Sequence, residues 1–355
     1  MMSKFDIKKN TKIYIVAPAN VATGGPELLH QLGYHLRNDL NLNTFMYYGK
    51  YKEGSPVHPN YIHYDVPYVD VIKDRKENIL IVPELYSNIL MLNSYKELQK
   101  SVWWLSVDFF YSSKFEFVHP IKSFFLRLNN YIAKKFDLLE LIDIPSYTVL
   151  NCNANLRDDI ALKSVDVHLV QSQYAFEHLQ SSKFDNIAFL SDYLNDDFLN
   201  ITTDILKKRN IVAYNPKKGA LFTKKIIQSA PDITFVPIEN MSRDQVIELL
   251  QRAKVYIDFG NHPGKDRIPR EAAILKCCVI TGKKGSSKYF EDVPINDEFK
   301  FEDIELNIEE IKKKIYEIFQ NYENNVIKFE DYIKMIKSEK DKFIQECRDI
   351  FGNVE

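Results

Sequence analysis

The sequence has 355 residues, 45% of them hydrophobic and 27% charged, an ordinary composition for a globular protein and enough chain for two domains of ~100–200 residues. The formal net charge of -2 leaves no basic surplus, so the composition does not favour a nucleic-acid partner. The 4 cysteines show no CxxC spacing, and no apolar run reaches the ~18 residues of a spanning helix; we therefore expect a reduced cytoplasmic protein, or one at the inner face of the membrane.

The first clear pattern is a strand, a glycine turn and a helix. Residues 12–18 (KIYIVAP) form an apolar run typical of a strand, and residues 23–27 (TGGPE) form a turn with paired glycines. Leucines then recur at helical spacing from Leu28 to Leu40, and Pro26 falls in the first helical turn, where proline is tolerated. This succession is typical of the start of a doubly wound α/β domain.

The alternation of strands and helices continues along the first half. Strands are predicted at residues 79–82, 102–107, 148–151 and 167–171, with helices at 86–98 and through Leu179. Ser172 is a predicted N-cap of that second helix. Asp108 follows directly after a predicted strand, so we expect its carboxylate to face the ligand cleft.

Residues 121–140 predict a basic amphipathic helix. Apolar residues recur along one side, and the polar side carries Lys122, Arg127, Lys134 and Lys135. One interpretation is a peripheral contact with an anionic membrane or with a lipid-linked acceptor. The other is a surface helix that packs its apolar side against its own domain.

A polar, turn-rich stretch at residues 193–210 separates the two halves, and the pattern then restarts. Strands are predicted at 211–214, 234–237, 255–259 and 278–281, with helices at 221–229, 246–253, 271–276, near 308–319 and from about 326 to 350. Ser242 and Gln245 form a capping-box pattern before the second of these helices.

The segment at 258–271 (DFGNHPGKDRIPRE) carries the densest functional pattern. Gly260 and Gly264 let backbone N–H groups approach a ligand closely. Three cations follow within six residues, Lys265, Arg267 and Arg270. A helix N-terminus with such cations holds a diphosphate well, and a carboxylate in its first turn, Glu271, can accept two hydrogen bonds from a ribose. In the alternative interpretation, Asp266 and Glu271 pair with the arginines on a polar surface.

Two more basic turns follow predicted strands, residues 215–219 (NPKKG) and 282–287 (GKKGSS). Ligands of doubly wound sheets bind at the carboxyl ends of the strands, so three cationic turns at matching ends favour one anionic ligand. The turn with Gly24 and Gly25 is the counterpart in the first half, and it matches neither the GxGxxG fingerprint nor a P-loop.

Together these motifs resemble the GT-B glycosyltransferases, most closely the family 4 (group 1) enzymes. Residues 24–27 (GGPE) resemble the GGxE turn near donor and acceptor, and residues 215–219 resemble the basic turn that contacts the donor diphosphate. Residues 269–286 (PREAAILKCCVITGKKGS) resemble the stretch that carries the ribose-binding glutamate, which places Glu271 in that role.

The resemblance implies an α/β protein of the GT-B fold, in which two Rossmann-like doubly wound domains face each other across a cleft. The acceptor domain would span residues 1–200, the nucleotide-sugar donor domain 201–335, and a C-terminal helix at 336–355 would pack back on the N-terminal domain. The implied activity is transfer of a sugar from a nucleotide diphosphate sugar to a growing glycan or lipid-linked glycan, in the synthesis of bacterial surface polysaccharide. The nucleotide sugar is a co-substrate, and no other cofactor is expected.

One position departs from the family pattern. The family usually has another glutamate eight positions before the ribose-binding one, where this chain has Pro263. His262, Lys265 or Asp266 could replace it, and retention or inversion at the transferred sugar stays open. The chain has no D-x-D motif, which favours metal-independent transfer in which basic side chains and helix dipoles neutralise the leaving diphosphate.

An inverting reaction needs a base for the acceptor proton. Asp108 is the first candidate, and Glu27 and His262 complete the predicted catalytic set. The predicted donor-binding residues are Gly24, Gly25, Lys217, Lys218, Gly264, Lys265, Asp266, Arg267, Arg270 and Glu271. Two other functions stay open, a GT-B-shaped binding or scaffold protein without turnover and a sugar-nucleotide epimerase.

Overall fold

The structure is a computed structural model that describes residues 4–52, 54–136, 142, 144–151, 156 and 159–352. Its contacts divide the chain into two compact units. Unit 1 comprises residues 1–128, 143–192 and 340–355, and unit 2 comprises 129–142 and 193–339. The division thus falls after Asp192, some residues before the predicted boundary at 200.

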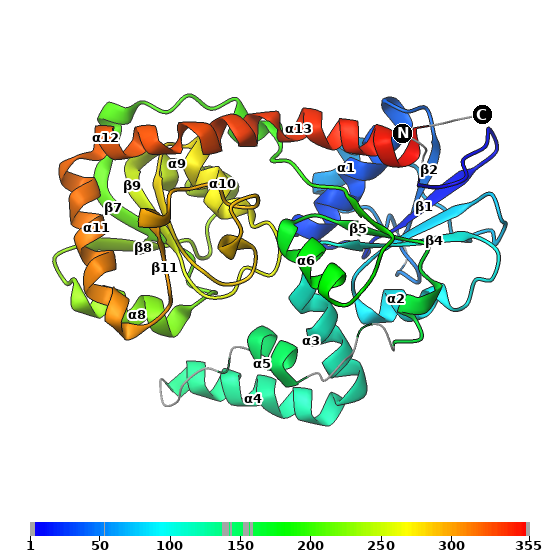
Figure 1. Ribbon diagram of the computed structural model, residues 1–355, viewed down its shortest axis with the longest axis horizontal. Helices are drawn as coiled ribbons and strands as arrows, with labels where there is room; N and C mark the ends of the chain where they lie inside the picture. The colour runs from blue at the N-terminus through cyan, green and yellow to red at the C-terminus, as the bar shows by residue number, and fades with distance from the viewer. Residues whose placement is uncertain are drawn as a thin grey trace. The chain divides into compact units, whose positions relative to one another are not determined.

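Unit 1 contains a six-stranded sheet in the order β2-β1-β3-β4-β5-β6, and every neighbouring pair is parallel (Figure 1). Its strands are β1 (Lys12–Val16), β2 (Asn43–Tyr47), β3 (Ile79–Pro83), β4 (Gln99–Trp104), β5 (Val167–Val170) and β6 (Ile187–Phe189). Its helices include α1 (Gly24–Asn38), α2 (Tyr86–Leu92), α3 (Val107–Val118), α5 (Ile144–Asn151) and α6 (Gln173–Ser181), and α4 (Pro120–Phe136) continues from unit 1 into residues grouped with unit 2.

The four inner strands of unit 1 are buried along most of their length, as expected for a parallel sheet covered on both faces. The two tryptophans, Trp103 and Trp104, are fully buried and still have partners for their indole N–H groups. The first donates to the carbonyl of Leu190 at 2.9 Å, and the second donates to Nδ1 of His168 at 3.1 Å. The sheet centre is therefore apolar but leaves neither indole N–H unpaired.

Several predicted elements of unit 1 were wrong in type or length. Residues 148–151 belong to helix α5 and not to a strand, and α2 ends at Leu92 instead of continuing to residue 98. The strand predicted at 102–107 ends at Trp104, because the side chain of Ser106 accepts from the N–H of Phe109 at 3.3 Å and begins α3. Strands β2 and β6 were not predicted. The end of the predicted helix at 121–140 lies outside the described residues from residue 137, as does Cys152.

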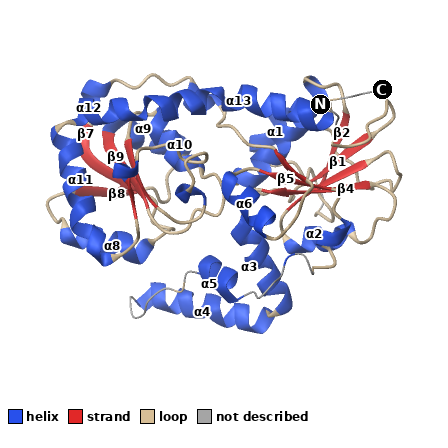
Figure 2. Cartoon of the chain, in the orientation of Figure 1, coloured by secondary structure: helices blue, strands red, loops and turns tan. Residues whose placement is uncertain are grey.

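Unit 2 contains a five-stranded parallel sheet in the order β11-β10-β9-β7-β8. Figure 2 draws its strands in red, with β7, β8 and β9 labelled. Its strands are β7 (Arg209–Tyr214), β8 (Thr234–Pro237), β9 (Ala253–Asp258), β10 (Cys278–Gly282) and β11 (Lys300–Phe301). Its helices are α7 (Asp196–Leu199), α8 (Ala220–Ser229), α9 (Arg243–Arg252), α10 (Arg267–Ile274), α11 (Ile308–Gln320) and α12 (Tyr322–Val326).

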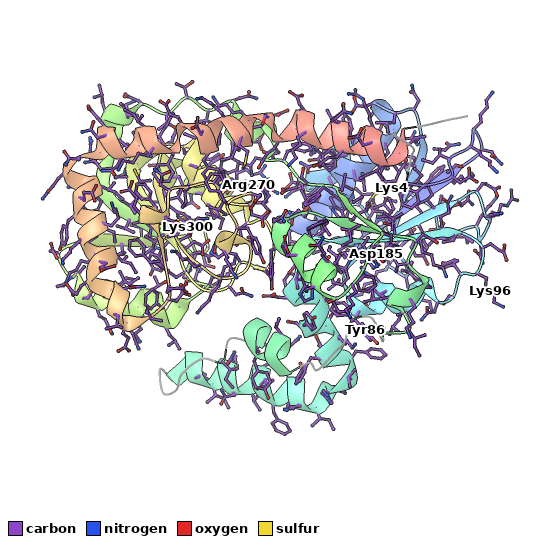
Figure 3. All side chains as sticks on the ribbon, in the orientation of Figure 1. Lys4, Tyr86, Lys96, Asp185, Arg270 and Lys300 are labelled. Atoms are coloured by element: carbon purple, nitrogen blue, oxygen red, sulfur yellow. The ribbon has the colours of Figure 1, made fainter. Side chains whose placement is uncertain are left out.

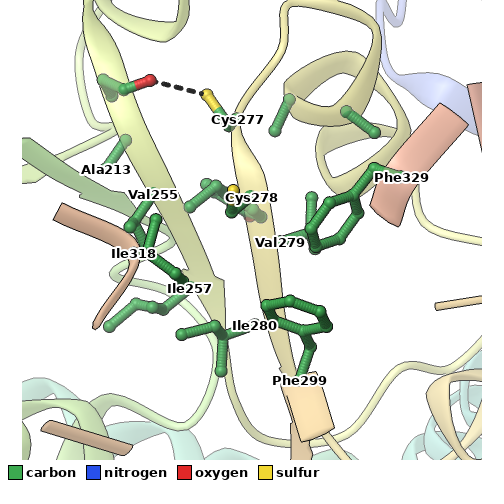
Figure 4. Close-up of a cluster of buried hydrophobic side chains, with 14 of the residues drawn as sticks. Ala213, Val255, Ile257, Cys277, Cys278, Val279, Ile280, Phe299, Ile318 and Phe329 are labelled. Carbon is green, nitrogen blue, oxygen red and sulfur yellow. Dashed lines mark hydrogen bonds between the residues drawn. The ribbon is translucent and has the colours of Figure 1, made fainter. Parts of the chain in front are cut away.

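The core of unit 2 forms around β9 and β10, where Val279 packs near Phe299 and Phe329 (Figure 4). The predicted capping box of α9 is confirmed, since Ser242 and Gln245 exchange both of its hydrogen bonds. Helix α10 begins at Arg267, four residues before its predicted start at 271. Pro269 can lie within its first turn because the N–H that proline lacks has no intrahelical partner there.

The last helix, α13 (Glu330–Phe351), belongs to unit 2 as far as Glu339 and to unit 1 from Lys340 onward. Its unit 1 part is anchored by Phe351, whose ring stacks on Phe5 at 5.3 Å, and by Phe343, whose ring meets His35 edge-on at 5.6 Å. Among the described residues, no helix is both long enough and apolar enough to cross a membrane.

The two sheets share one strand order. In each, the first strand lies between the second and the third: β1 between β2 and β3, and β7 between β8 and β9. The loops on either side of such a reversal lead to opposite faces of the sheet and leave a crevice at the carboxyl ends of the strands. The fold therefore gives each unit one preferred position for a ligand.

Candidate functional site

The crevice of unit 2 is bordered by the loops after β7 and β9, which touch backbone to backbone at Gly219 and Gly260. Gly219 has φ +51° and Gly260 has φ +92°, both in the region that favours glycine. A Cβ atom on Gly219 would lie 2.5 Å from the carbonyl carbon of Phe259 and 2.6 Å from the nitrogen of Gly260. Only glycine fits this contact, which draws the N-terminus of α8 to the end of β9.

The third basic turn joins the same edge, so the structure brings together the three turns that the sequence singled out. The N–H of Ser286 donates to the carbonyl of His262 at 2.8 Å, and its hydroxyl donates to the carbonyl of Gly264 at 2.6 Å. Asp303, which the sequence did not single out, accepts from the N–H of Gly260 at 2.9 Å and lies 3.2 Å from Nζ of Lys284. The three loops thus form one framework at the carboxyl ends of β7, β9 and β10.

A buried network of charged side chains lies inside this framework. Lys218 forms an ion pair with Asp266, and Nδ1 of His262 lies 2.7 Å from Oδ2 of the same aspartate. The other ring nitrogen of His262 is 3.2 Å from the backbone carbonyl of Asp258. The carboxylate of Asp258 accepts from the hydroxyl of Tyr256 at 2.9 Å. Lysine, histidine and two aspartates therefore form one continuous cluster.

The pKa shifts of Asp266 and His262 agree with a charged pair, whereas burial raises the pKa of Asp258. Burial raises the pKa of Asp266, but the charge of Lys218 and the contact with His262 outweigh it and bring that pKa down to about 2. Burial lowers the pKa of His262, yet the charges of Asp258 and Asp266 outweigh it, so the pKa ends above its ordinary value. Asp266 is therefore ionised near neutral pH and holds Lys218 in place.

Among the residues that the structure describes, Asp258, His262 and Asp266 form a group that could hold a metal ion. One ligand atom from each lies within 4.8 Å of the others. The ammonium group of Lys218 already bonds to Asp266, so a cation of the chain itself meets this cluster. The geometry serves to position a lysine at least as well as to hold a metal ion.

The cations that border the crevice differ in accessibility. Lys217 is exposed, and its N–H donates to the side chain of Asn215 at 3.0 Å, which shapes the turn. Lys218 and Arg267 are partly exposed, and Nε of Arg267 lies 3.7 Å from a carboxylate oxygen of Glu271, one helical turn further along α10. These cations and the N-terminal ends of α8 and α10 are suited to an anion such as a diphosphate.

Lys265 and Arg270 have surroundings unlike those predicted for donor-binding cations. Arg270 is fully buried (Figure 3), and its guanidinium donates to Glu339 at 2.7 Å and to the backbone carbonyls of Lys265 and Asp266 at 3.1 and 3.2 Å. Nζ of Lys265 lies 2.6 Å from the other oxygen of Glu339. Both cations therefore tie this segment to the middle of α13, and neither faces solvent.

His262 is likewise fully buried, which sets it apart from the predicted catalytic role. Its backbone bridges Gly285, and its ring nitrogens face Asp258 and Asp266. An imidazole enclosed in this way cannot touch a substrate, so in this structure it positions Asp266 and, through it, Lys218.

In unit 1 the predicted turn lies at the carboxyl end of β1, where Gly24 and Gly25 are the first two residues of α1. Glu27 follows in the first turn and is largely buried, with the hydroxyl of Tyr64 at 3.5 Å from its carboxylate. The hydroxyl of Tyr61 donates to the carbonyl of Thr23 at 2.8 Å. The turn is thus flanked by aromatic rings at the N-terminus of a helix.

Asp108 lies in the first turn of α3 and not at a strand end, and it is almost fully buried. The hydroxyl of Tyr174 donates to its carboxylate at 3.3 Å. A second buried acid at this edge, Glu84, was missed by the sequence reasoning; its carboxylate accepts from the N–H of Leu105 at 3.1 Å. Burial raises the pKa of Glu84 to about 8. The only sequence signal for Glu84 was its position just after a predicted strand.

No protein-family model matches the chain, and no curated protein matches it. Solved structures match it over nearly its whole length. A glycosyltransferase from Rickettsia africae is 14% identical, with a TM-score of 0.55, over 97% of this chain and 100% of that one. HepE from Anabaena in complex with UDP is 9% identical, with a TM-score of 0.57, over 96% and 98%. Sucrose-phosphate synthase from Thermosynechococcus elongatus is 11% identical, with a TM-score of 0.52, over 96% and 95%.

At these identities the likeness establishes the fold. The chain has the GT-B fold, the α/β fold of two parallel-sheet units that these glycosyltransferases share, as the sequence motifs predicted.

Proposed function

We propose that the chain is a glycosyltransferase that moves a sugar from a nucleotide diphosphate sugar to a glycan acceptor. The observation that carries this proposal is the carboxyl edge of the unit 2 sheet, where the N-termini of α8 and α10 and the basic turns meet at the reversal of strand order. HepE, which shares the fold, has been crystallised with UDP and with UDP-glucose, and this supports a nucleotide-sugar donor for the present chain.

Lys217, Lys218 and Arg267 would neutralise the donor diphosphate as the bond to the sugar breaks. Their cations, together with the dipoles of α8 and α10, would supply this stabilisation, and we expect transfer without a metal ion. Glu271, which is 8% exposed, would accept hydrogen bonds from the ribose, and Arg267 one turn away would fix its carboxylate. The contact between Gly219 and Gly260 would hold the backbone N–H groups of the first loop close to a diphosphate bound at this edge.

On the acceptor side, Glu27 is the candidate that best keeps its predicted role. Asp108 and His262 are more deeply buried, whereas Glu27 lies beside the glycine turn at the start of α1. If the reaction inverts the sugar, Glu27 would take the proton of the acceptor hydroxyl. We expect the acceptor to be a glycan, free or lipid-linked, of a bacterial surface polysaccharide assembled in the cytoplasm.

Donor binding tests the site. Lys218→Ala and Glu271→Gln should each weaken the affinity for a nucleoside diphosphate by about 10- to 100-fold in titration calorimetry, the value of a charge-assisted hydrogen bond. Lys225→Ala is the matched control, because Lys225 pairs with Glu305 on the exposed side of α8 in the same unit. Equal nucleotide affinity in all three variants would refute the assignment of the site.

A turnover assay distinguishes a glycosyltransferase from an epimerase and from a binding protein. The protein is incubated with each sugar nucleotide, with and without glycan acceptors, and nucleoside diphosphate release is measured. Release that depends on the acceptor is expected. Conversion of the donor sugar without any acceptor would indicate an epimerase, and donor binding without release in the presence of every acceptor would indicate a binding protein.

A further inference from the structure

Helix α4 exposes the side that an amphipathic helix normally buries. Its apolar residues recur three or four positions apart along one stripe, yet they are 37–73% exposed: Ile121, Phe124, Phe125, Leu128, Tyr131 and Ile132. Phe117 and Val118, at the end of α3, are more than half exposed as well. The apolar side therefore does not pack against the helix's own domain, which removes one of the two interpretations of the sequence.

The inward side of α4 is made of small and polar residues. Ser123 and Ala133 are buried, and the side chain of Asn130 exchanges two hydrogen bonds with the backbone of Ile142, at 2.6 and 2.9 Å. The ammonium group of Lys122 lies 5.7 Å from the ring centres of both Phe115 and Tyr147, on α3 and α5. These contacts fix the rotation of the helix with its apolar stripe outward.

The charged residues within α4 itself have one sign. The sequence of α4 contains no aspartate or glutamate, and it carries Lys122, Arg127, Lys134 and Lys135. The acid Glu116, near the end of α3, pairs with Arg127 at 2.5 Å. An apolar stripe flanked by cations complements a surface that offers both hydrocarbon and negative charge, and that surface is an anionic lipid bilayer.

We infer that α4 and the end of α3 dock the protein on an anionic membrane surface, with the apolar stripe lying in the interface plane. A second copy of the chain fits this face less well, because two facing stripes would bring their flanking cations together. The inference goes beyond the proposed sugar transfer and does not depend on it. It brings the acceptor side of such an enzyme to the place where lipid-linked glycans are found.

Co-sedimentation of the full chain with vesicles tests the inference. Wild-type protein should bind phosphatidylglycerol-containing vesicles, bind phosphatidylcholine vesicles at least tenfold more weakly, and lose binding as salt is raised. Phe124→Ser with Phe125→Ser should abolish binding, because both rings belong to the exposed apolar stripe. Leu206→Ser with Leu306→Ser is the matched control, since both leucines are highly exposed in unit 2.

Several outcomes would overturn the inference. They are equal binding by the phenylalanine variant and the wild type, no preference for anionic lipid, or no vesicle binding at all. Sedimentation velocity adds one more, since a wild-type dimer that the phenylalanine variant loses, without vesicle binding, would show that a second copy covers the face. Donor binding in calorimetry should be the same in wild type and variant, so a failure of membrane docking stays distinguishable from a failure of the proposed activity.

Discussion

The contact between Gly219 and Gly260 gives a prediction that the structure makes quantitative. In Gly219→Ala, the new methyl group would lie 2.5–2.6 Å from backbone atoms of Phe259 and Gly260. Ordinary contacts between such atoms are ~3.5–4.0 Å, so one loop must move by about 1 Å. A left-handed φ costs an alanine about 1–2 kcal/mol, and overpacking adds about 1–3 kcal/mol. We therefore expect a loss of about 2–5 kcal/mol of unfolding free energy.

Gly49→Ala is the matched control. Gly49 has φ +64°, close to the φ of +51° at Gly219, but a Cβ atom there would meet nothing within 4 Å. Gly49→Ala should therefore lose only the unfolding free energy that a left-handed φ costs an alanine, about 1–2 kcal/mol. Urea unfolding followed by far-UV circular dichroism reports both units, and tryptophan fluorescence reports unit 1 alone, because Trp103 and Trp104 are the chain's 2 tryptophans.

The expected result is a larger stability loss for Gly219→Ala than for Gly49→Ala, seen by circular dichroism. If the two variants lost the same stability, the loops after β7 and β9 would not be in the close contact described, and the reasoning would be refuted.

Three further predictions concern buried charges. Burial raises the pKa of Glu84 to about 8, so between pH 4.5 and 8 the folded chain keeps a proton that the unfolded chain loses. The unfolding free energy of the wild type should therefore fall, relative to that of Glu84→Gln, by about 1.4 kcal/mol per pH unit in this range. Parallel pH profiles of the two proteins in urea unfolding would contradict this. Glu339→Gln should lower the unfolding free energy by about 3–5 kcal/mol, since it leaves Arg270 and Lys265 buried without their carboxylate. The control Glu330→Gln, at the exposed first residue of α13, should leave the thermal melt unchanged. Lys208→Met should lower the urea midpoint, because Nζ of Lys208 donates to the buried carbonyls of Leu250, Ala253 and Leu275 at 2.6–2.8 Å. The thiol of Cys277 also donates to the first two carbonyls at 3.2 Å, so we expect the main cost at Leu275, about 1–3 kcal/mol for a carbonyl left unpaired, and an unchanged midpoint would contradict this.

The fold was largely predictable because its signals are local. Parallel strands buried on both faces appear as apolar runs, and the cap residues Ser172, Ser242 and Gln245 bond within a few positions of themselves. The errors arose where a local signal was ambiguous. The apolar run at 148–151 is short enough to fit a strand or a helix, and the structure makes it part of α5.

The site was predictable in outline for a similar reason. A glycine beside lysines after an apolar strand is readable from sequence, and parallel strands bring such turns to one edge. The sequence did not predict which of these cations would be buried in the folded protein. Lys217 and Lys218 remain accessible to different degrees, while Arg270, within the same motif as Glu271, is fully enclosed.

The sequence by itself determined that the chain alternates strands and helices in two halves and places three glycine-containing basic turns at strand ends, because period, capping and turn chemistry act over a few residues. Only the tertiary structure decided which charged side chains are buried in ion pairs and which helix faces are exposed to solvent. Arg270 is paired by Glu339, 69 positions away, and the apolar stripe of α4 is turned outward by contacts with α3 and α5. Burial and ion pairing depend on segments that meet only after folding, so no local pattern could have fixed them.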